Sequence, residues 1–331
     1  MTREAYAAIK SQLDFRDSIL SSFAIIALDA ALLVAWWALL QQGGVPAYLA
    51  SQVLLAIVMF HGFCLVHEAG HGNCSRKRWL NTWIGHYASI FCALPFFSWK
   101  HMHARHHVWA GNPDKDPANN SVQRWRAKGR VPWIVRASWR TWIPLAAFTQ
   151  MLVFWAYPLR LLREDRAAMP QALLSVLFLP AAYGAIYFVA PDIFELRHFS
   201  LGVVIYLFAN ELVNVPHHAD KLVFSDRLPL WNQWKATRSC YYPLFVSESL
   251  VLNFNFHIEH HLFPALPWFR LRRARTLIRA ALGDDYNEAI GIRWNLINRG
   301  RDIESVLGVR RDDGESKRPS TQHDQRPSAR R

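Results

Sequence analysis

The sequence has little cysteine and no internal repeat. Its four cysteines, Cys64, Cys74, Cys92 and Cys240, form no C-x-x-C pair, which argues against a disulfide framework or a zinc ribbon. No segment recurs at a fixed period, so a solenoid or propeller is not indicated. Acidic residues are also scarce: 25 Asp and Glu stand against 38 Lys and Arg, for a formal net charge of +13.

The surplus of basic residues lies beside apolar segments, as it does in membrane proteins. Lys and Arg in these positions set membrane topology and attract anionic lipid, so we expect a membrane and no nucleic acid as partner. Hydrophobic residues make up 52% of the chain and 15 residues are Trp, which is typical of a membrane protein with interfacial aromatic belts. The first apolar segment has no clean cleavage site after it, and this indicates a retained anchor.

Four apolar segments are long enough to cross a bilayer as helices. A hydrocarbon core of about 30 Å needs roughly 20 helical residues. The first segment is interrupted only by Asp29. The uncharged turn at 41–46 and the basic run at 76–78 place the termini and the histidines on the inner side. The expected spans are residues 19–40, 47–66, 171–190 and 199–215.

Two further apolar segments are expected to lie along the membrane interface. A crossing at 79–99 would put His67 and His103 on opposite faces, and Pro95 breaks this segment. A crossing at 142–158 would leave three arginines, at 160, 163 and 166, outside, against the positive-inside rule. The chain is therefore predicted to be an all-α integral membrane protein with four transmembrane helices, interfacial helices and a cytosolic cap.

The chain is expected to form one membrane domain over residues 1–309, followed by a basic tail at 310–331. The cap is assigned to residues 219–300, which are polar with short apolar patches. The tail is rich in Arg, Asp, Ser and Pro and lacks apolar residues, so we expect it to be disordered.

Nine of the 15 histidines fall into four groups at the inner ends of the expected spans. Two groups are H-x-x-H-H boxes, in which helical spacing places the imidazoles on one face. The third is an H-x-x-x-H pair, and the fourth is a histidine four residues after Asn214. The nine candidate ligands are His67, His71, His103, His106, His107, His218, His257, His260 and His261.

Nine imidazoles exceed what one metal ion binds, and they suit two ions of four to six ligands each. Imidazole without thiolate suits zinc, copper, iron or nickel. A zinc-dependent membrane hydrolase or receptor would need only three or four of these ligands. A metal transporter would carry its polar ligands in mid-membrane rather than at the ends of spans. The pattern therefore favours a redox metal pair acting on an apolar substrate.

Ten other side chains near the histidine groups can each be interpreted in two ways, as part of the site or as ordinary structure. Three histidines off the repeated spacing can support the ligands or have no role at the site: His61, His101 and His217. Three carboxylates can accept the second ring N–H of a ligand or face solvent: Glu68, Glu211 and Glu259. Four aromatic residues can line a substrate groove or serve only in packing: Trp99, Trp109, Phe254 and Phe256. Ordinary packing or surface roles are expected for His86, His198 and His323.

The order H-x-x-x-H, H-x-x-H-H, N-x-x-x-H, H-x-x-H-H between paired spans resembles the membrane-bound fatty acid desaturase superfamily. The stretch Asn-Phe-His-Ile-Glu-His-His-Leu-Phe-Pro at 255–264 is similar to bacterial acyl-lipid desaturases. The likeness covers roughly residues 20–280. It implies a four-span helical bundle under a cytosolic cap and a location in a bacterial inner membrane.

The resemblance also implies a site and its cofactors. The nine histidines would hold two iron ions, and Asn214 would contact a metal through water. Spacing from Asn214 favours His218 over His217 as the ligand, although Pro216 precedes both. The reaction would use O₂ and two electrons from a separate ferredoxin or cytochrome-b-type donor, because the chain has no His-Pro-Gly-Gly haem element and no cysteine cluster.

The expected reaction is the introduction of a double bond into a fatty acyl chain. The alternative is a hydroxylase or ketolase of a hydrocarbon or carotenoid-like lipid on the same scaffold. The histidine groups do not separate the two, and the stretch at 111–117 occurs in related forms in both branches.

Overall fold

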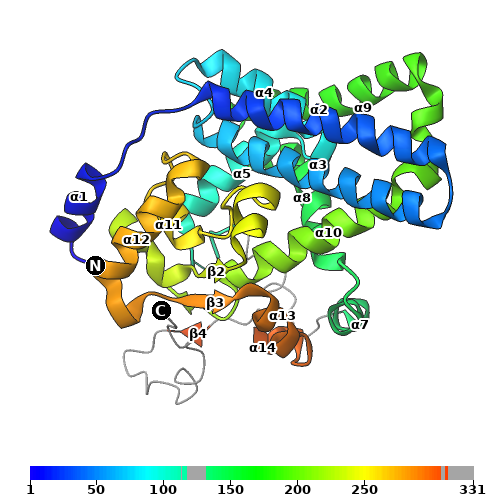
Figure 1. Cartoon of the computed structure of the whole chain (residues 1–331). Helices are drawn as coiled ribbons and strands as arrows, with labels where there is room; N and C mark the ends of the chain where they lie inside the picture. The colour runs from blue at the N-terminus through cyan, green and yellow to red at the C-terminus, as the bar shows by residue number, and fades with distance from the viewer. Residues whose placement is uncertain (113, 118–131, 307–309, 312–331) are drawn as a thin grey trace.

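The computed structural model describes residues 1–112, 114–117, 132–306 and 310–311. It is a helical bundle that continues into a smaller cap (Figure 1). The α-helices are α1 (Arg3–Ser11), α2 (Ile19–Gln42), α3 (Val45–His71), α4 (Arg78–Cys92), α5 (Phe96–Trp109), α7 (Trp133–Thr141), α8 (Leu145–Glu164), α9 (Met169–Val189), α10 (Leu196–His218), α11 (His257–Leu262), α12 (Leu271–Leu282), α13 (Gly291–Arg299) and α14 (Ile303–Val306).

Short helices and strands complete the described part of the chain. The short helices are η1 (Pro191–Phe194), η2 (Leu230–Ala236), η3 (Val246–Leu250), η4 (Trp268–Arg270) and η5 (Gly283–Asp285). The strands form two parallel pairs: β1 (Leu222–Val223) with β4 (Arg310–Arg311), and β2 (Ser239–Tyr241) with β3 (Glu288–Ile290). The expected disordered tail falls outside the described residues, except for Arg310 and Arg311 in β4.

Helices α2 and α3 form an antiparallel pair, and the residues that connect them are typical of a tight turn. Gly43 and Gly44 have φ of 74° and 82°, a region that glycine adopts without steric strain. Pro46 stands in the first turn of α3, where its missing N–H removes no helical hydrogen bond. At the other end, Gly72 has φ of 79° and closes α3 directly after His71. This stop fixes where the first histidine pair is presented.

Among the described residues, five helices are long and apolar enough to cross a membrane: α2, α3, α8, α9 and α10. Four of them match the expected spans, and α8 is one more than the sequence indicated. Leu145 at the start of α8 shares a cavity with His218, and Glu164 at its end pairs with Arg105 on α5. Both ends of α8 therefore lie beside the elements that carry histidines, which favours the interfacial position expected for residues 142–158.

Helix α4 also agrees with an interfacial position. It has 15 residues, so its length is about 22 Å, too short for the hydrocarbon core of a bilayer. Ala93, with φ of 54°, ends α4, and α5 follows at Phe96. The chain thus reaches the first H-x-x-H-H box without crossing the membrane between His67 and His103.

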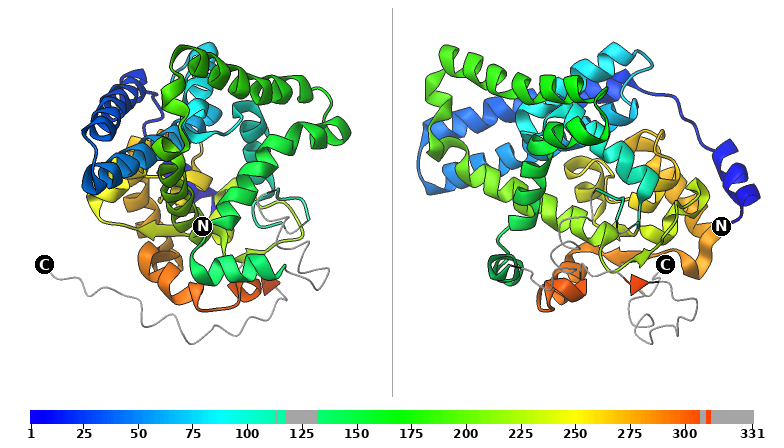
Figure 2. Two further views of the ribbon diagram at one scale, coloured as in Figure 1. Left: turned by 90° about the vertical axis from the view of Figure 1, so that its right-hand side faces the viewer. Right: turned by 180° about the vertical axis from the view of Figure 1, so that it is seen from behind.

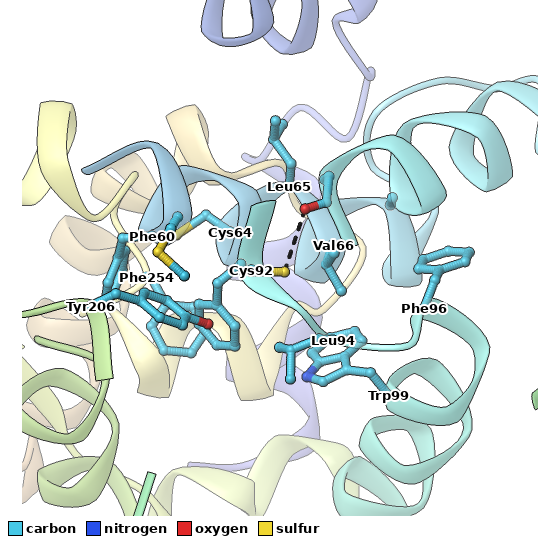
Figure 3. Close-up of a cluster of buried hydrophobic side chains, with 14 of the residues drawn as sticks. Phe60, Cys64, Leu65, Val66, Cys92, Leu94, Phe96, Trp99, Tyr206 and Phe254 are labelled. Atoms are coloured by element: carbon cyan, nitrogen blue, oxygen red, sulfur yellow. Dashed lines mark hydrogen bonds between the residues drawn. The ribbon is translucent and has the colours of Figure 1, made fainter. Parts of the chain in front are cut away.

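The largest core surrounds the C-terminal half of α3. Phe60, Cys64 and Val66 are buried there with Tyr206 of α10 and Phe254 of the cap, as Figure 3 shows. Complete burial of an aliphatic or aromatic side chain contributes roughly 1.5–3 kcal/mol. This apolar contact fixes α3, α10 and the start of the second box relative to one another.

A second core holds the cap together around α11 and α12. Ile258 and Leu262 of α11 are completely buried among apolar residues of α12. The N-terminal helix α1 covers this core from outside (Figure 2), where Tyr6 stacks on Phe263 with ring centroids 4.8 Å apart. The hydroxyl of Tyr6 also donates to the carbonyl of Leu262. The second H-x-x-H-H box is therefore held by packing on its outer side.

Candidate metal centre

The nine candidate histidines converge from four helices: α3, α5, α10 and α11. Two groups of four can each hold a metal ion, because within each group one ring nitrogen per residue lies within 4.8 Å of the others. Group 1 is His67, His71, His103 and His260, and group 2 is His106, His218, His257 and His261. The ninth, His107, adjoins group 1, with its Nε2 2.9 Å from Nε2 of His260 and 3.0 Å from that of His103.

Each H-x-x-H-H box contributes to both groups. In α5, His103 belongs to group 1 and His106 to group 2; in α11, His260 belongs to group 1 and His261 to group 2. With 3.6 residues per turn, consecutive residues of a helix point about 100° apart, and so do the second and third histidines of each box. A single box therefore spans a wide face rather than one line. Because the histidines of one box point in different directions, two short helices can each contribute to two adjacent sites.

The imidazoles are oriented by hydrogen bonds at Nδ1. Nδ1 of His106 lies 2.8 Å from Oδ1 of Asp116, and Nδ1 of His261 lies 3.1 Å from Oε1 of Gln233. Nδ1 of His218 lies 3.2 Å from the carbonyl oxygen of Ala236. An oxygen acceptor at Nδ1 selects the tautomer in which Nδ1 carries the proton. Nε2 then offers its lone pair toward the centre of the group.

The Nε2 atoms face one another at distances from 2.9 to 3.3 Å. Lone pairs this close repel unless a positive charge lies between them. Adjacent ligands at right angles around one metal ion, each with an imidazole bond of roughly 2.1 Å, are about 3 Å apart. The donor set and its spacing therefore fit bound metal ions.

Burial keeps these imidazoles in the form that binds metal. Desolvation, reinforced by neighbouring imidazoles, lowers the pKa of His103, His107, His257, His260 and His261 well below its usual value. A neutral imidazole is required of a ligand. The protein thus presents neutral rings without needing to remove protons at neutral pH.

Sequence reasoning missed two of the orienting residues. Asp116 is completely buried and lies in the stretch 111–117, which was noted without a role for this carboxylate. Gln233 lies in η2, where it also donates to the carbonyl of His107 over 2.6 Å. Asp116 follows His106 by only ten residues, and this short separation in the sequence could have indicated that the two side chains meet. Gln233 has no local signal, because only the fold brings η2 to α11.

The three carboxylates considered as ring partners have different roles. Oε1 of Glu68 lies 3.4 Å from Nδ1 of His67, in agreement with one of the two interpretations. Glu259 instead accepts hydrogen bonds from Ser239 and Tyr286, both at 2.6 Å. Glu211 accepts from Arg299 over 2.6 Å and from the N–H of Ala147 over 3.1 Å. Glu259 and Glu211 therefore hold the scaffold, and no imidazole contact of theirs is among the described hydrogen bonds.

The other described histidines lie outside the two groups. His217 stacks on His257 at 4.2 Å, and among the described residues neither of its ring nitrogens has a hydrogen-bond partner. His61 pairs with Asp29, and His101 and His86 lie near Phe97. Nδ1 of His198 lies 2.8 Å from the carbonyl of Asp192. His323 lies outside the described residues.

A cavity of about 270 Å³ opens beside the histidines. His103, His106, His218 and His257 line it together with apolar side chains of α7, α8 and α10. Of the four candidate aromatics, Trp99 and Phe254 line it, whereas Phe256 is buried in the cap core and Trp109 lies under Lys115. Asn214 also lines it and donates through Nδ2 to Asn210.

The sequence model of the fatty acid desaturase family matches residues 43–291, a range that contains all nine histidines. The chain is similar to the sn-1 acyl-lipid omega-3 desaturase (ferredoxin) of Synechocystis sp., with 25% identity across 82% of this chain and 79% of that protein. It is 28% identical to the sn-1 oleoyl-lipid 12-desaturase of Picosynechococcus sp., across 84% and 80% of the two chains. It is 24% identical to the omega-3 fatty acid desaturase fat-1 of Caenorhabditis elegans, across 81% and 70%.

Proposed function

Because the chain belongs to the fatty acid desaturase family, we propose that its nine histidines hold two iron ions that desaturate an acyl chain of a membrane lipid. The protein is a membrane oxidoreductase that introduces a double bond into a fatty acyl chain. The observation that carries the proposal is the pair of imidazole groups, whose Nε2 lone pairs converge beside an apolar cavity.

The assignment of residues to the two irons follows the two groups. His67, His71, His103, His107 and His260 would hold one ion. His106, His218, His257 and His261 would hold the other. Bound iron supplies the two-electron activation of O₂, in which –CH₂–CH₂–, O₂, two electrons and two protons become –CH=CH– and two waters.

The protein's own side chains position the ligands and the substrate. Asp116, Gln233 and the carbonyl of Ala236 fix three rings of the second group. Asn214 lines the cavity with Asn210 and His218, and its Nδ2 is engaged, so its Oδ1 would be the atom that accepts from a water bound to the metal. Trp99 and Phe254 form apolar wall beside the histidines, which excludes bulk water from the reacting carbons.

The proposed substrate is an acyl chain of a glycerolipid, and the proposed electron donor is a separate ferredoxin. Relatives with these words in their names support both assignments. We place the protein in a bacterial inner membrane because of its likeness to cyanobacterial desaturases. We place its site at the cytoplasmic face because basic residues follow the histidine-bearing ends of α3 and α10. The hydroxylase or ketolase alternative is not favoured, because the relatives are named desaturases.

Expression in a host with a defined lipid pool, followed by mass spectrometry of the lipids, tests the reaction. Loss of two hydrogens from an acyl chain is the expected result, and it should disappear in a His106→Ala variant. Gain of one oxygen would instead identify the hydroxylase or ketolase. Lipids that do not change while the protein is present with iron and ferredoxin would refute the assignment of substrate class.

A further inference from the structure

One segment of the cap lies beside the transmembrane helix α3 rather than above it. His61 of α3 donates from Nε2 to the carbonyl of Ser249 over 2.7 Å, and the thiol of Cys64 reaches the carbonyl of Val251 at 3.4 Å. His61 precedes the inner end of α3 at His71 by ten residues, or about 15 Å of helix. The segment around η3 therefore lies beside α3 at a level closer to the bilayer centre than the inner end of this span.

The backbone of this segment is irregular, and protein groups satisfy its polar atoms. η3 is a π-helix, and Leu252 and Asn253 after it have φ of 46° and 54°. Non-helical backbone is tolerated at membrane depth only where the protein itself provides hydrogen-bond partners. His61 and Cys64 provide them for two carbonyls, and the hydroxyl of Ser247 bonds to Asn253 and Asn255.

Helix α13 is tied to a transmembrane helix in a similar way. Pro216 in α10 has no N–H to bond the carbonyl of Leu212. That carbonyl instead accepts from Asn295 of α13 over 2.9 Å and from the hydroxyl of Tyr242 over 3.3 Å. Leu212 lies six residues before the end of α10 at His218, so α13 runs alongside the last turns of this span (Figure 1).

The outward surface of these elements is largely apolar, and the charged residue of η3, Glu248, pairs with Arg272 of α12. Leu244 and Phe245 before η3 are 52% and 67% exposed. Tyr241 and Ile290 are register partners in the β2–β3 pair. In α13, Ile292 and Leu296 are one turn apart and 57% and 62% exposed. We name this surface the cap apolar face: Tyr241, Leu244, Phe245, Ile290, Ile292 and Leu296.

Another helix of the cap has the opposite character. The exposed positions of α12 include Arg272, Arg273 and Arg279, which suits contact with water. A water-facing helix normally carries charged or polar residues on its exposed side. The exposed side of α13 carries Ile292, Leu296 and Ile297. Arg293 is the one exposed arginine of this helix. Such a side chain can place its charge at the headgroups while its stem lies in lipid.

We propose that the cap apolar face is embedded in the inner leaflet of the bilayer, with lipid acyl chains as its partner. The hydrogen bonds to Ser249 and Leu212 set its depth beside α3 and α10. Val204 of α10, eight residues before Leu212, is a 50% exposed apolar residue nearer the centre of the same span. The proposal rests on the membrane position of α3 and α10 and not on the reaction, so its failure would leave the proposed function standing.

Single-cysteine labelling in proteoliposomes tests this position directly. The four native cysteines are buried, so an environment-sensitive fluorophore will label an introduced surface cysteine preferentially. The test variants are Phe245→Cys and Leu296→Cys, and the matched control is Arg273→Cys on α12. Each labelled full-length protein is exposed to aqueous iodide and, separately, to lipids with a nitroxide on the acyl chain. A melting temperature in detergent equal to that of the unsubstituted protein shows that each variant is folded.

The expected result is strong quenching by acyl-chain nitroxide at positions 245 and 296 with little quenching by iodide. Position 273 should show the reverse. Equal access of iodide to all three positions would overturn the proposal. Protection of 245 and 296 from both quenchers, with energy transfer between differently labelled copies, would also overturn it and assign the face to a second copy of the chain.

Discussion

Nδ1 of His61 in α3 lies 2.6 Å from Oδ1 of Asp29 in α2, and both side chains are almost completely buried. The other nitrogen, Nε2, faces the carbonyl of Ser249, which can only accept a hydrogen bond. Nε2 must therefore carry a proton, and a single proton is shared between Nδ1 and the carboxyl of Asp29. The pair is neutral overall, which makes its burial within two spans physically tolerable.

This relationship predicts opposite outcomes for two substitutions of Asp29. Asp29→Asn retains a polar group that can donate to Nδ1 and preserve the Nε2–H directed at Ser249, so thermal stability in detergent should change little. Asp29→Leu leaves Nδ1 buried without a partner, which costs roughly 1–3 kcal/mol. A clearly lower melting temperature is expected for the Leu variant alone. Equal melting temperatures for the two variants would contradict the pairing.

His217 and His218 are neighbours whose replacement by Phe should have opposite effects. Phe keeps a ring but offers no nitrogen. At 218 the change removes Nε2 from the second group, so metal content should fall and activity should disappear. At 217 the ring nitrogens have no described partner, and removing unpaired buried polar atoms should leave metal content unchanged and raise stability by about 1 kcal/mol. Metal analysis and thermal unfolding of both variants check this, and metal loss at 217 would reverse the assignment.

Because Asp116 contacts His106, substitutions of Asp116 should weaken metal binding by the second group to different degrees. Asp116→Asn keeps an oxygen that can accept from Nδ1, whereas Asp116→Leu removes the acceptor at the 2.8 Å contact. Loss of such a partner typically lowers metal affinity or activity by roughly 10–100-fold. We expect that loss for the Leu variant and a much smaller one for Asn, measured as metal retained against a competing chelator. Identical retention in both variants would mean that Asp116 has only a packing role.

The sequence predicted well those features that depend on a single segment. The four expected spans correspond to α2, α3, α9 and α10, because length and apolar composition determine whether one helix can cross a bilayer. The four histidine groups were recognisable for the same reason, since helical spacing within each is local. The membrane-bound desaturase likeness was carried by these groups and is confirmed by the family match.

The features that sequence missed depend on how separate helices are placed. Periodicity gives the direction of a side chain around its own axis, but not which neighbour lies there. The division of each box between two groups, with His260 and His261 in different groups, was therefore not foreseen. Gln233 was missed because its contact with His261 joins residues 28 positions apart. The contact of Asn295 in α13 with Leu212 in α10 was missed for the same reason, because it joins residues 83 positions apart.

The metal content of the purified protein tests the central claim most directly. Full-length protein produced in iron-replete medium should contain about two iron atoms per chain by elemental analysis, one for each imidazole group. The His218→Phe variant should lose the ion of the second group and retain the other. One zinc atom per chain without iron, or undiminished iron in the His218→Phe variant, would contradict the two-iron account.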